Sequence, residues 1–161
     1  MKVITAPESI DSIFESRCCF LAGGITNCKE WQKDVIELLS KYDGILFNPR
    51  RNNFPINDQG AARTQILWEF NALERADVFS MWFSNAPSDQ PICFYELGRH
   101  LALRKAFGEL NSVVIGVEPG FKRTQDVLIQ TELVSPKLAA RISNNLEDHA
   151  KNILSAMRSA E

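Results

Sequence analysis

The sequence predicts an α/β protein, a three-layer α/β/α sandwich around a mostly parallel sheet. Short continuous apolar runs that end in turn residues alternate with longer stretches of helical periodicity, and such runs are typical of strands buried on both faces. Strands that alternate with helices form a parallel sheet covered by helices on both sides. The length of 161 residues, with 45% hydrophobic residues, predicts a single domain over residues 1–161.

In the first half of the chain, turn residues separate two apolar runs from two helical stretches. The run at 18–22 ends in Gly23-Gly24, and Asn48-Pro49 stops the second run. Residues 49–60 are polar and rich in turn residues, so we expect a long loop of the kind that often carries function. The expected elements are strands at 18–22 and 45–47, a helix at 31–42, and a helix at 61–75 with Ile66, Leu67, Phe70 and Leu73 on one face.

The second half continues the alternation and then becomes less regular. Its clear elements are a strand at 78–83, a helix at 92–107 and a strand at 113–117. Residues 127–129 fit a short helix or a strand, and residues 133–134 fit a further strand. Proline is favoured at the first helical position, so Pro136 is expected to begin a final helix that continues to Met157. We therefore expect a C-terminal helical extension from about residue 135.

Charge and cysteine content exclude several classes of protein. Eighteen basic and twenty acidic residues give a formal net charge of −2, which argues against a broad nucleic-acid-binding surface. The four cysteines form no C-x-x-C pair, and the two histidines lie far from the cluster of Cys18, Cys19 and Cys28, so we expect no zinc site. Cys18 and Cys19 are expected to be buried free thiols. The sequence has no signal peptide and no membrane-spanning run, which predicts a soluble, cytoplasmic protein.

Four loops follow the predicted strands and are expected to surround one crevice. In open parallel sheets, ligands bind beyond the carboxyl ends of the strands. The sequence contains no glycine-rich dinucleotide-binding turn, no P-loop and no nucleophile elbow. The chemistry of the crevice is therefore expected to come from carboxylates, amides and arginines. The four loops are residues 23–27, 48–60, 84–91 and 118–123.

Glu96, early in the helix after the third strand, is the first candidate for a catalytic carboxylate. The positive end of that helix would favour its ionised, nucleophilic form; the alternative is an exposed acid that only stabilises the helix. The simplest interpretation of Glu69 is a solvated helix residue. Asp89 lies in the loop before Glu96 and is either solvated or within reach of the crevice. Asp77 is expected to hydrogen-bond its own turn.

Arg50 and Arg51 directly follow the second strand. One interpretation is that both side chains bind a phosphate or carboxylate group of a ligand. An equally good one is that one arginine is an exposed surface charge and the other forms an ion pair with a nearby acid. Asn52 and Asn53 could read the edge of a nucleobase or serve as ordinary turn residues.

Four segments in order along the chain resemble the nucleoside 2-deoxyribosyltransferase family, especially its short bacterial and phage branch. The resemblance covers roughly residues 18–125 and does not extend to the C-terminal helical region. The segments are Phe20-Leu21-Ala22-Gly23-Gly24-Ile25, Phe47-Asn48-Pro49-Arg50-Arg51, Gln65-Ile66-Leu67-Trp68-Glu69 with Ala76-Asp77, and Pro91-Ile92-Cys93-Phe94-Tyr95-Glu96-Leu97-Gly98.

The resemblance implies a parallel sheet of about five strands, Rossmann-like or flavodoxin-like, and an active site without metal or cofactor. It places the nucleophile at Glu96 and a base-protonating acid at Glu69, where the family more often has Asp. A further family Asp falls on Gln90, and the neighbouring Asp89 is the candidate to substitute for it. Cys19 stands where the family often has an aromatic hydroxyl that orients the nucleophile. The substrate-binding residues that we expect from this comparison are Gly23, Gly24, Asn48, Arg50, Arg51, Asn53 and Gln90.

The implied reaction is a retaining double displacement in which Glu96 attacks the anomeric carbon of a nucleoside or nucleotide and a second, free base accepts the sugar. One alternative is a hydrolase of nucleoside 5′-monophosphates, which Arg50 and Arg51 favour. A second alternative is a non-catalytic nucleotide-binding module, and a weaker third is a NAD-consuming signalling domain. Because the family usually forms homo-oligomers with sites near subunit contacts, we also expect a homo-oligomer, with the C-terminal region as one candidate contact.

Overall fold

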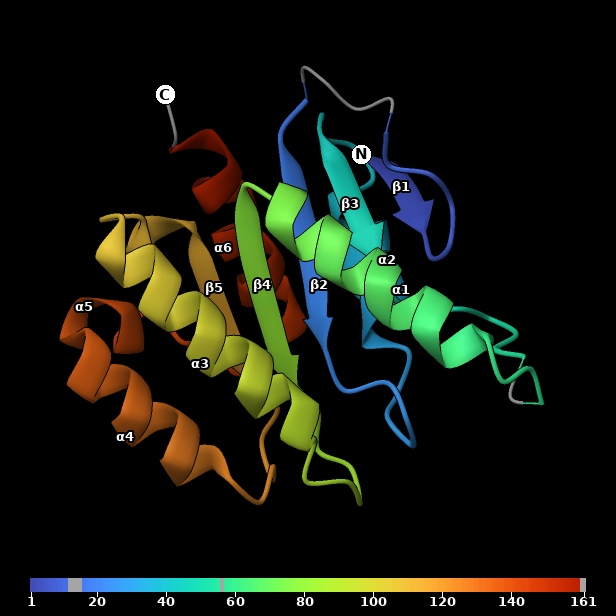
Figure 1. Cartoon of the computed structure of the whole chain (residues 1–161). Helices are drawn as coiled ribbons and strands as arrows, with labels where there is room; N and C mark the ends of the chain where they lie inside the picture. The colour runs from blue at the N-terminus through green and yellow to red at the C-terminus, as the bar shows by residue number, and fades with distance from the viewer. Residues whose placement is uncertain (12–15, 56, 160–161) are drawn as a thin grey trace.

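Five parallel strands form the centre of the computed structural model, which describes residues 1–11, 16–55 and 57–159. The strand order is β1-β3-β2-β4-β5, so β3 and β1 lie on one side of β2, and β4 and β5 lie on its other side (Figure 1). This arrangement confirms the predicted three-layer sandwich. The strands are β1 (Lys2–Thr5), β2 (Cys18–Gly23), β3 (Ile45–Asn48), β4 (Val78–Phe83) and β5 (Val113–Val117).

Helices cover both faces of the sheet (Figure 1). One face carries α2 and α3, with α4 and α5 packed beyond them, and the other face carries α1 and α6. The helices are α1 (Trp31–Leu39), α2 (Ala61–Arg75), α3 (Pro91–Ala106), the 3-10 turn η1 (Leu110–Ser112), α4 (Thr124–Val134), α5 (Pro136–Ala139) and α6 (Leu146–Arg158).

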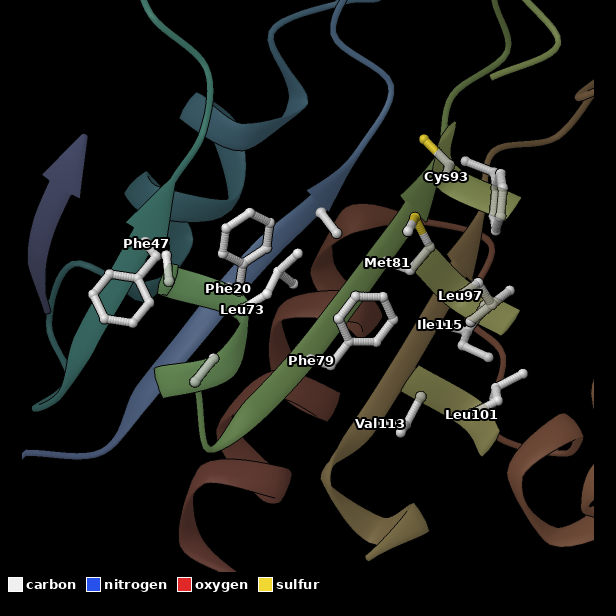
Figure 2. Close-up of a cluster of buried hydrophobic side chains, with 14 of the residues drawn as sticks. Phe20, Phe47, Leu73, Phe79, Met81, Cys93, Leu97, Leu101, Val113 and Ile115 are labelled. Atoms are coloured by element: carbon white, nitrogen blue, oxygen red, sulfur yellow. The ribbon is translucent and has the colours of Figure 1, made fainter. Parts of the chain in front are cut away.

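The hydrophobic core lies on both sides of the sheet because successive strand side chains point to opposite faces. Phe20 and Phe79 pack beneath α2 and α3 (Figure 2). Leu21 and Trp82 pack on the other face against α1 and α6. All four cysteines are free and buried, which confirms the prediction for Cys18 and Cys19.

The structure corrects the prediction for both ends of the chain. The fifth strand is β1, at the N-terminus, where it pairs with β3. Residues 127–129 and 133–134 belong to one helix, α4, so the strand considered at 133–134 is wrong. The expected helix from Pro136 to Met157 is interrupted after α5, because Ser143 forms a backbone bridge to Gly116 and Asn145 caps a new helix by accepting a hydrogen bond from the Asp148 N–H.

The apolar face expected on helix 61–75 is only partly buried. Leu73 lies in the core, whereas Ile66, Leu67 and Phe70 are exposed. Trp68 and Ala72 bury the helix against the sheet in their place. The outer surface of α2 is therefore more apolar than a solvated helix usually is.

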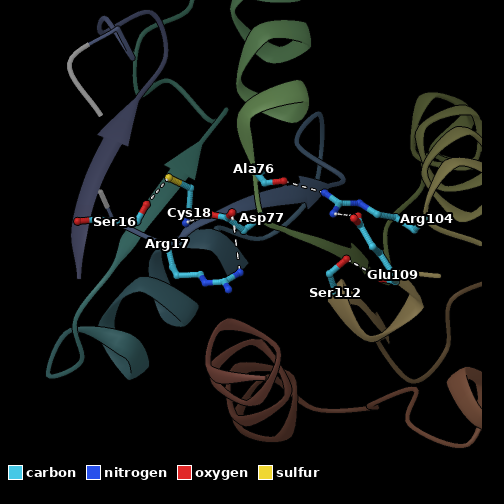
Figure 3. Close-up of polar contacts among 8 residues, drawn as sticks. All are labelled: Ser16, Arg17, Cys18, Ala76, Asp77, Arg104, Glu109 and Ser112. Atoms are coloured by element: carbon cyan, nitrogen blue, oxygen red, sulfur yellow. Dashed lines mark hydrogen bonds and ion pairs between the residues drawn. The ribbon is translucent and has the colours of Figure 1, made fainter. Parts of the chain in front are cut away.

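Polar contacts join the amino ends of β2 and β4 (Figure 3). Asp77 Oδ2 accepts a hydrogen bond of 2.8 Å from the Cys18 N–H, and Arg17 Nη1 lies 3.9 Å from Asp77 Oδ1. Asp77 thus bridges two strands, where the sequence predicted a bond within its own turn. Arg104 closes the same end by donating to the Ala76 carbonyl at 2.7 Å. These contacts lie at the opposite end of the sheet from the loops expected to bind a ligand.

His149 of α6 is fully buried and hydrogen-bonds on both sides. Its Nε2 lies 2.8 Å from Ser80 Oγ of β4, and its Nδ1 lies 3.1 Å from Ser143 Oγ. Burial lowers the pKa of His149 to about 3. A neutral His149 therefore connects α6 to the middle of the sheet.

No helix in the described ranges combines the length and the apolar character that a membrane crossing requires.

Candidate functional site

A cavity of about 260 Å³ opens at the carboxyl ends of β2 and β4. The strand order reverses between these two strands, which is where ligands bind in open parallel sheets. Two of the four predicted crevice loops, those after β2 and β4, supply half of its lining residues. The lining residues are Phe20, Ala22, Gly23, Gly24, Ile25, Thr26, Pro49, Glu69, Ser88, Gln90, Pro91, Ile92, Cys93 and Glu96.

Two half-buried carboxylates, Glu69 and Glu96, line this cavity together. Glu69 comes from the middle of α2 and Glu96 from the second turn of α3. Both helices lie on the same face of the sheet, so residues 27 positions apart in sequence meet at one site. Sequence reasoning had named both carboxylates, and the structure brings them together.

Glu96 departs from the expected charge state. Burial, followed by the negative charge of Glu69, raises the pKa of Glu96 to about 7, and Arg99 only partly opposes this. The sequence predicted that the helix end would favour the ionised form. Glu96 is the sixth residue of α3, whereas the field of a helix end weakens beyond the first turn. Burial therefore outweighs the helix field, and the pKa of Glu96 lies near neutral pH.

Gln65 holds the second carboxylate in place. Its Nε2 donates to Glu69 Oε1 at 2.8 Å and to the Pro49 carbonyl at 2.7 Å, so one amide spans α2 and the loop after β3. Burial raises the pKa of Glu69, and the hydrogen bond from Gln65 opposes that rise. Sequence reasoning missed Gln65 as a site residue, although it lies one helical turn before Glu69 on the same face of α2.

Gly23 and Gly24 form a close wall of the cavity. Gly23 has a φ of 151°, and a Cβ added to it would lie 2.3 Å from the Trp82 carbonyl oxygen. A Cβ on Gly24 would lie 2.4 Å from Gln90 Oε1. Both positions therefore exclude a side chain, and the backbone itself faces the cavity.

Gln90 lies in the cavity wall, but its amide is already engaged. Its Nε2 donates to the Ser84 carbonyl at 2.6 Å, and its Oε1 accepts from the Ser84 N–H at 3.2 Å. The backbone of Gln90 has a left-handed φ of 51°, which is uncommon for a residue other than glycine. Gln90 thus shapes the loop between β4 and α3.

The other predicted site residues lie outside this cavity. Asn48, Arg50, Arg51 and Asn53 line a separate cavity beside β1 and β3. Asp89 is exposed and lines a groove between α3 and α4. Of the residues in the 118–123 loop, Glu118 holds the crevice loops together by pairing with Lys29 at 2.8 Å and accepting from the Asn85 N–H at 2.8 Å.

The cavity offers acid–base and nucleophilic chemistry from its carboxylates. Burial raises the pKa of the Cys93 thiol, another wall residue, to about 12, so this thiol is a poor nucleophile at neutral pH. Among residues 1–11, 16–55 and 57–159, no three His, Cys, Asp or Glu side chains cluster as metal ligands would. Two carboxylates with raised pKa values in one cavity suit the paired nucleophile and acid of glycosidic bond cleavage.

Comparison with protein-family models gives a match over most of the chain. Residues 17–119 match the protein-family model described as "Nucleoside 2-deoxyribosyltransferase like". The matched range begins just before β2 and ends after β5, and it contains every residue that lines the cavity. None of the curated proteins compared with the chain is significantly similar to it.

Proposed function

Because the chain belongs to the nucleoside 2-deoxyribosyltransferase-like family, we propose that it cleaves the N-glycosidic bond of a nucleoside or nucleotide and transfers the sugar to another base. The observation that carries this proposal is the joint presence of Glu69 and Glu96 in one cavity at the switch in strand order. The family acts on nucleosides and nucleobases, which agrees with a small-molecule site of this size.

In the proposed reaction, a carboxylate oxygen of Glu96 attacks the anomeric carbon of the sugar as the bond to the base nitrogen breaks. The bonding electron pair goes to the base, which takes a proton from Glu69. A second base then attacks the sugar–Glu96 ester, returns the electron pair to Glu96 and gives its proton to Glu69. The pair needs one proton in total, and in the reacting state that proton lies on Glu69.

The raised pKa of Glu96 means that the proposed nucleophile must give up a proton before it attacks the sugar. A carboxyl group with a pKa of about 7 readily exchanges its proton with a neighbour at neutral pH. When a substrate fills the cavity, transfer of the proton from Glu96 to Glu69 would leave Glu96 ionised for attack on the sugar and Glu69 protonated as the acid for the leaving base. The raised pKa of Glu69 favours its retention of that proton.

Hydrolysis of nucleoside 5′-monophosphates loses its main support. That alternative depended on Arg50 and Arg51 binding the 5′-phosphate of the substrate, and both line the other cavity. We therefore place base exchange ahead of phosphate-dependent hydrolysis.

A product assay tests the proposal. The purified protein is incubated with a panel of purine and pyrimidine nucleosides, with and without a second base, and the products are separated by chromatography. We expect a new nucleoside only when the acceptor base is present, and no product from Glu96→Ala. The matched control is Asp89→Asn, an exposed acid outside the cavity, which should keep full activity. Unchanged turnover by Glu96→Ala would refute the nucleophile, and base release without transfer would make the protein a hydrolase.

We further propose that two copies of the chain associate through the outer surface of α2 and α3. Ile66 on α2 and Tyr95 on α3 are 64% and 71% exposed. Arg99 of α3 stacks 4.9 Å from the Phe70 ring centroid of α2, so the two helices present one continuous surface. Ile92 belongs to this surface and also lines the cavity, so a second copy would cover the cavity mouth.

A further inference from the structure

A second cavity, of about 580 Å³, lies beside the carboxyl ends of β1 and β3. Its walls come from three segments that are distant in sequence: Thr5 at the end of β1, Gln32 and Lys33 in the first turn of α1, and the loop residues 50–53 after β3. We propose that this cavity is a binding site for an oxyanion, namely a phosphate group that is free or carried by a small metabolite.

The charge of the wall favours an anion. Lys33, Arg50 and Arg51 line the cavity together with a single acid, Glu30, although the whole chain has a net charge of −2. Within the described ranges, neither Lys33 nor Arg51 forms an ion pair with a carboxylate. The Arg51 guanidinium lies 5.5 Å from the Phe54 ring centroid, which leaves its N–H donors available.

Arg50 adds a fixed positive charge to the same wall. Its guanidinium donates to the Cys28 carbonyl at 2.9 Å, to the Lys29 carbonyl and to Gln32 Oε1 at 3.2 Å. These three acceptors are neutral, so they hold the guanidinium in place without cancelling its charge. Three of its five N–H donors are used, which leaves two for a ligand.

Gln32 provides a second, independent observation. Its side chain is fully buried and belongs to the wall of this cavity, yet its Nε2 has no hydrogen-bond partner. A buried amide donor without a partner costs free energy. A small shift of the Gln32 amide toward a bound oxyanion would satisfy it.

The second cavity is distinct from the cavity that contains Glu69 and Glu96. Pro49 lines the carboxylate cavity, whereas its neighbours Asn48 and Arg50 line the second one. Side chains of an extended segment alternate between its two sides. The segment that leaves β3 therefore separates the two cavities, and a ligand of the second cavity is not the reacting sugar.

Calorimetric titration with inorganic phosphate, at constant ionic strength, tests this proposal. We expect saturable binding with one site per chain. The double variant Lys33→Ala with Arg51→Ala should weaken binding by about tenfold or more, because charge-assisted hydrogen bonds to the anion are lost. Arg63→Ala removes an exposed arginine of α2 that lines neither cavity and should bind phosphate like the wild type.

Further measurements locate the site and the source of the phosphate. In a ¹⁵N NMR titration with phosphate, we expect the largest amide shifts at Thr5, Lys33 and residues 50–53. Tighter binding of ribose 5-phosphate would indicate a metabolite, and equal binding would indicate free phosphate. The proposal fails if phosphate does not saturate, if the double variant binds like the wild type, or if Glu69→Gln weakens phosphate binding. None of these readouts depends on base exchange.

Discussion

The pKa of Glu96 depends on the charge of Glu69. Two carboxylates that share a half-buried cavity cannot both ionise without cost, and Glu69 is the main charged group that raises the pKa of Glu96. A single substitution at position 69 therefore changes the pKa of Glu96 without altering the Glu96 side chain itself.

We predict that Glu69→Gln lowers the pKa of Glu96 below its wild-type value of about 7. Removing the negative charge makes ionisation of Glu96 easier, so its titration moves to lower pH. The measurement is a ¹³C NMR titration of the glutamate carboxyl carbons, which does not require activity. Asp89→Asn is the matched control and should leave the Glu96 titration unchanged, since Asp89 is exposed and outside the cavity. An unmoved Glu96 titration in Glu69→Gln would show that the two carboxylates do not interact.

Individual site residues were predictable only in part from the sequence. Glu69 and Glu96 stand in segments that resemble a known family, and both line the cavity. Gln65 was missed because its role depends on the Pro49 carbonyl, which the fold brings to it from another element. Arg50 lines a different cavity from the two carboxylates, and a sequence does not reveal to which side of the segment after β3 its side chain points.

At the scale of elements, His149 secures α6 to the sheet through two serine hydroxyls. Ser143 Oγ donates to the Ile115 carbonyl at 3.3 Å, so it accepts from His149 Nδ1, and His149 Nε2 accepts from Ser80. The pKa of about 3 keeps His149 neutral in the folded chain, whereas the unfolded chain takes up a proton below about 6.5. The contribution of His149 to stability is therefore complete above pH 6.5 and falls as the pH decreases toward 3.

We predict that Ser80→Ala lowers the free energy of unfolding by about 1–3 kcal/mol, because it leaves a buried ring nitrogen without a partner. Urea denaturation at pH 7.5 measures this loss. Ser155→Ala removes an exposed serine of α6, the helix that carries His149; it is the control and should change stability by less than about 0.5 kcal/mol. For the wild type, the free energy of unfolding should decrease between pH 6.5 and pH 4. A wild type whose stability does not change over this range, or a Ser80→Ala variant as stable as the wild type at pH 7.5, would contradict this role of His149.

Elements that turn residues delimit along the chain were the most predictable. The strands at 78–83 and 113–117 and the helix at 61–75 have the bounds that the sequence predicts, since apolar runs and turn residues define them locally. β1 was missed because four residues carry too little pattern, and its pairing with β3 defines it. The break before α6 was missed because it depends on a bridge between Ser143 and Gly116, which are distant in sequence.

At the scale of the whole molecule, the surface of α2 and α3 controls the proposed association of two copies. Exposed apolar side chains on adjacent helices lose contact with water when they pair with the same surface of another chain. We predict that the wild type sediments as a dimer at micromolar concentration and that Ile66→Lys sediments as a monomer.

A matched variant keeps this prediction specific. Leu133 is 76% exposed but lies on α4, outside the α2 and α3 surface. Leu133→Lys introduces the same charge and should remain dimeric in analytical ultracentrifugation. A monomeric wild type would refute the proposed dimer, and dissociation by Leu133→Lys would move the contact to α4.

The layered architecture was predictable because short apolar runs alternate with amphipathic helical stretches along most of the sequence. The division of the crevice loops between two cavities was not, because it depends on how the Asn48–Arg50 segment leaves β3.

The edges of the sheet have a consequence for how the folded chain behaves at high concentration. β1 is only four residues long, and on β5 the Val117 N–H donates to Ser143 while the Ser143 N–H donates to Ile115, at 2.9 and 3.1 Å. Long open strand edges are templates on which further chains add as strands and grow into fibrils. With one edge short and the other partly occupied, the native molecule offers little template for fibril growth. Fibrils should therefore form only after unfolding, and conditions that keep the chain folded should keep concentrated solutions clear.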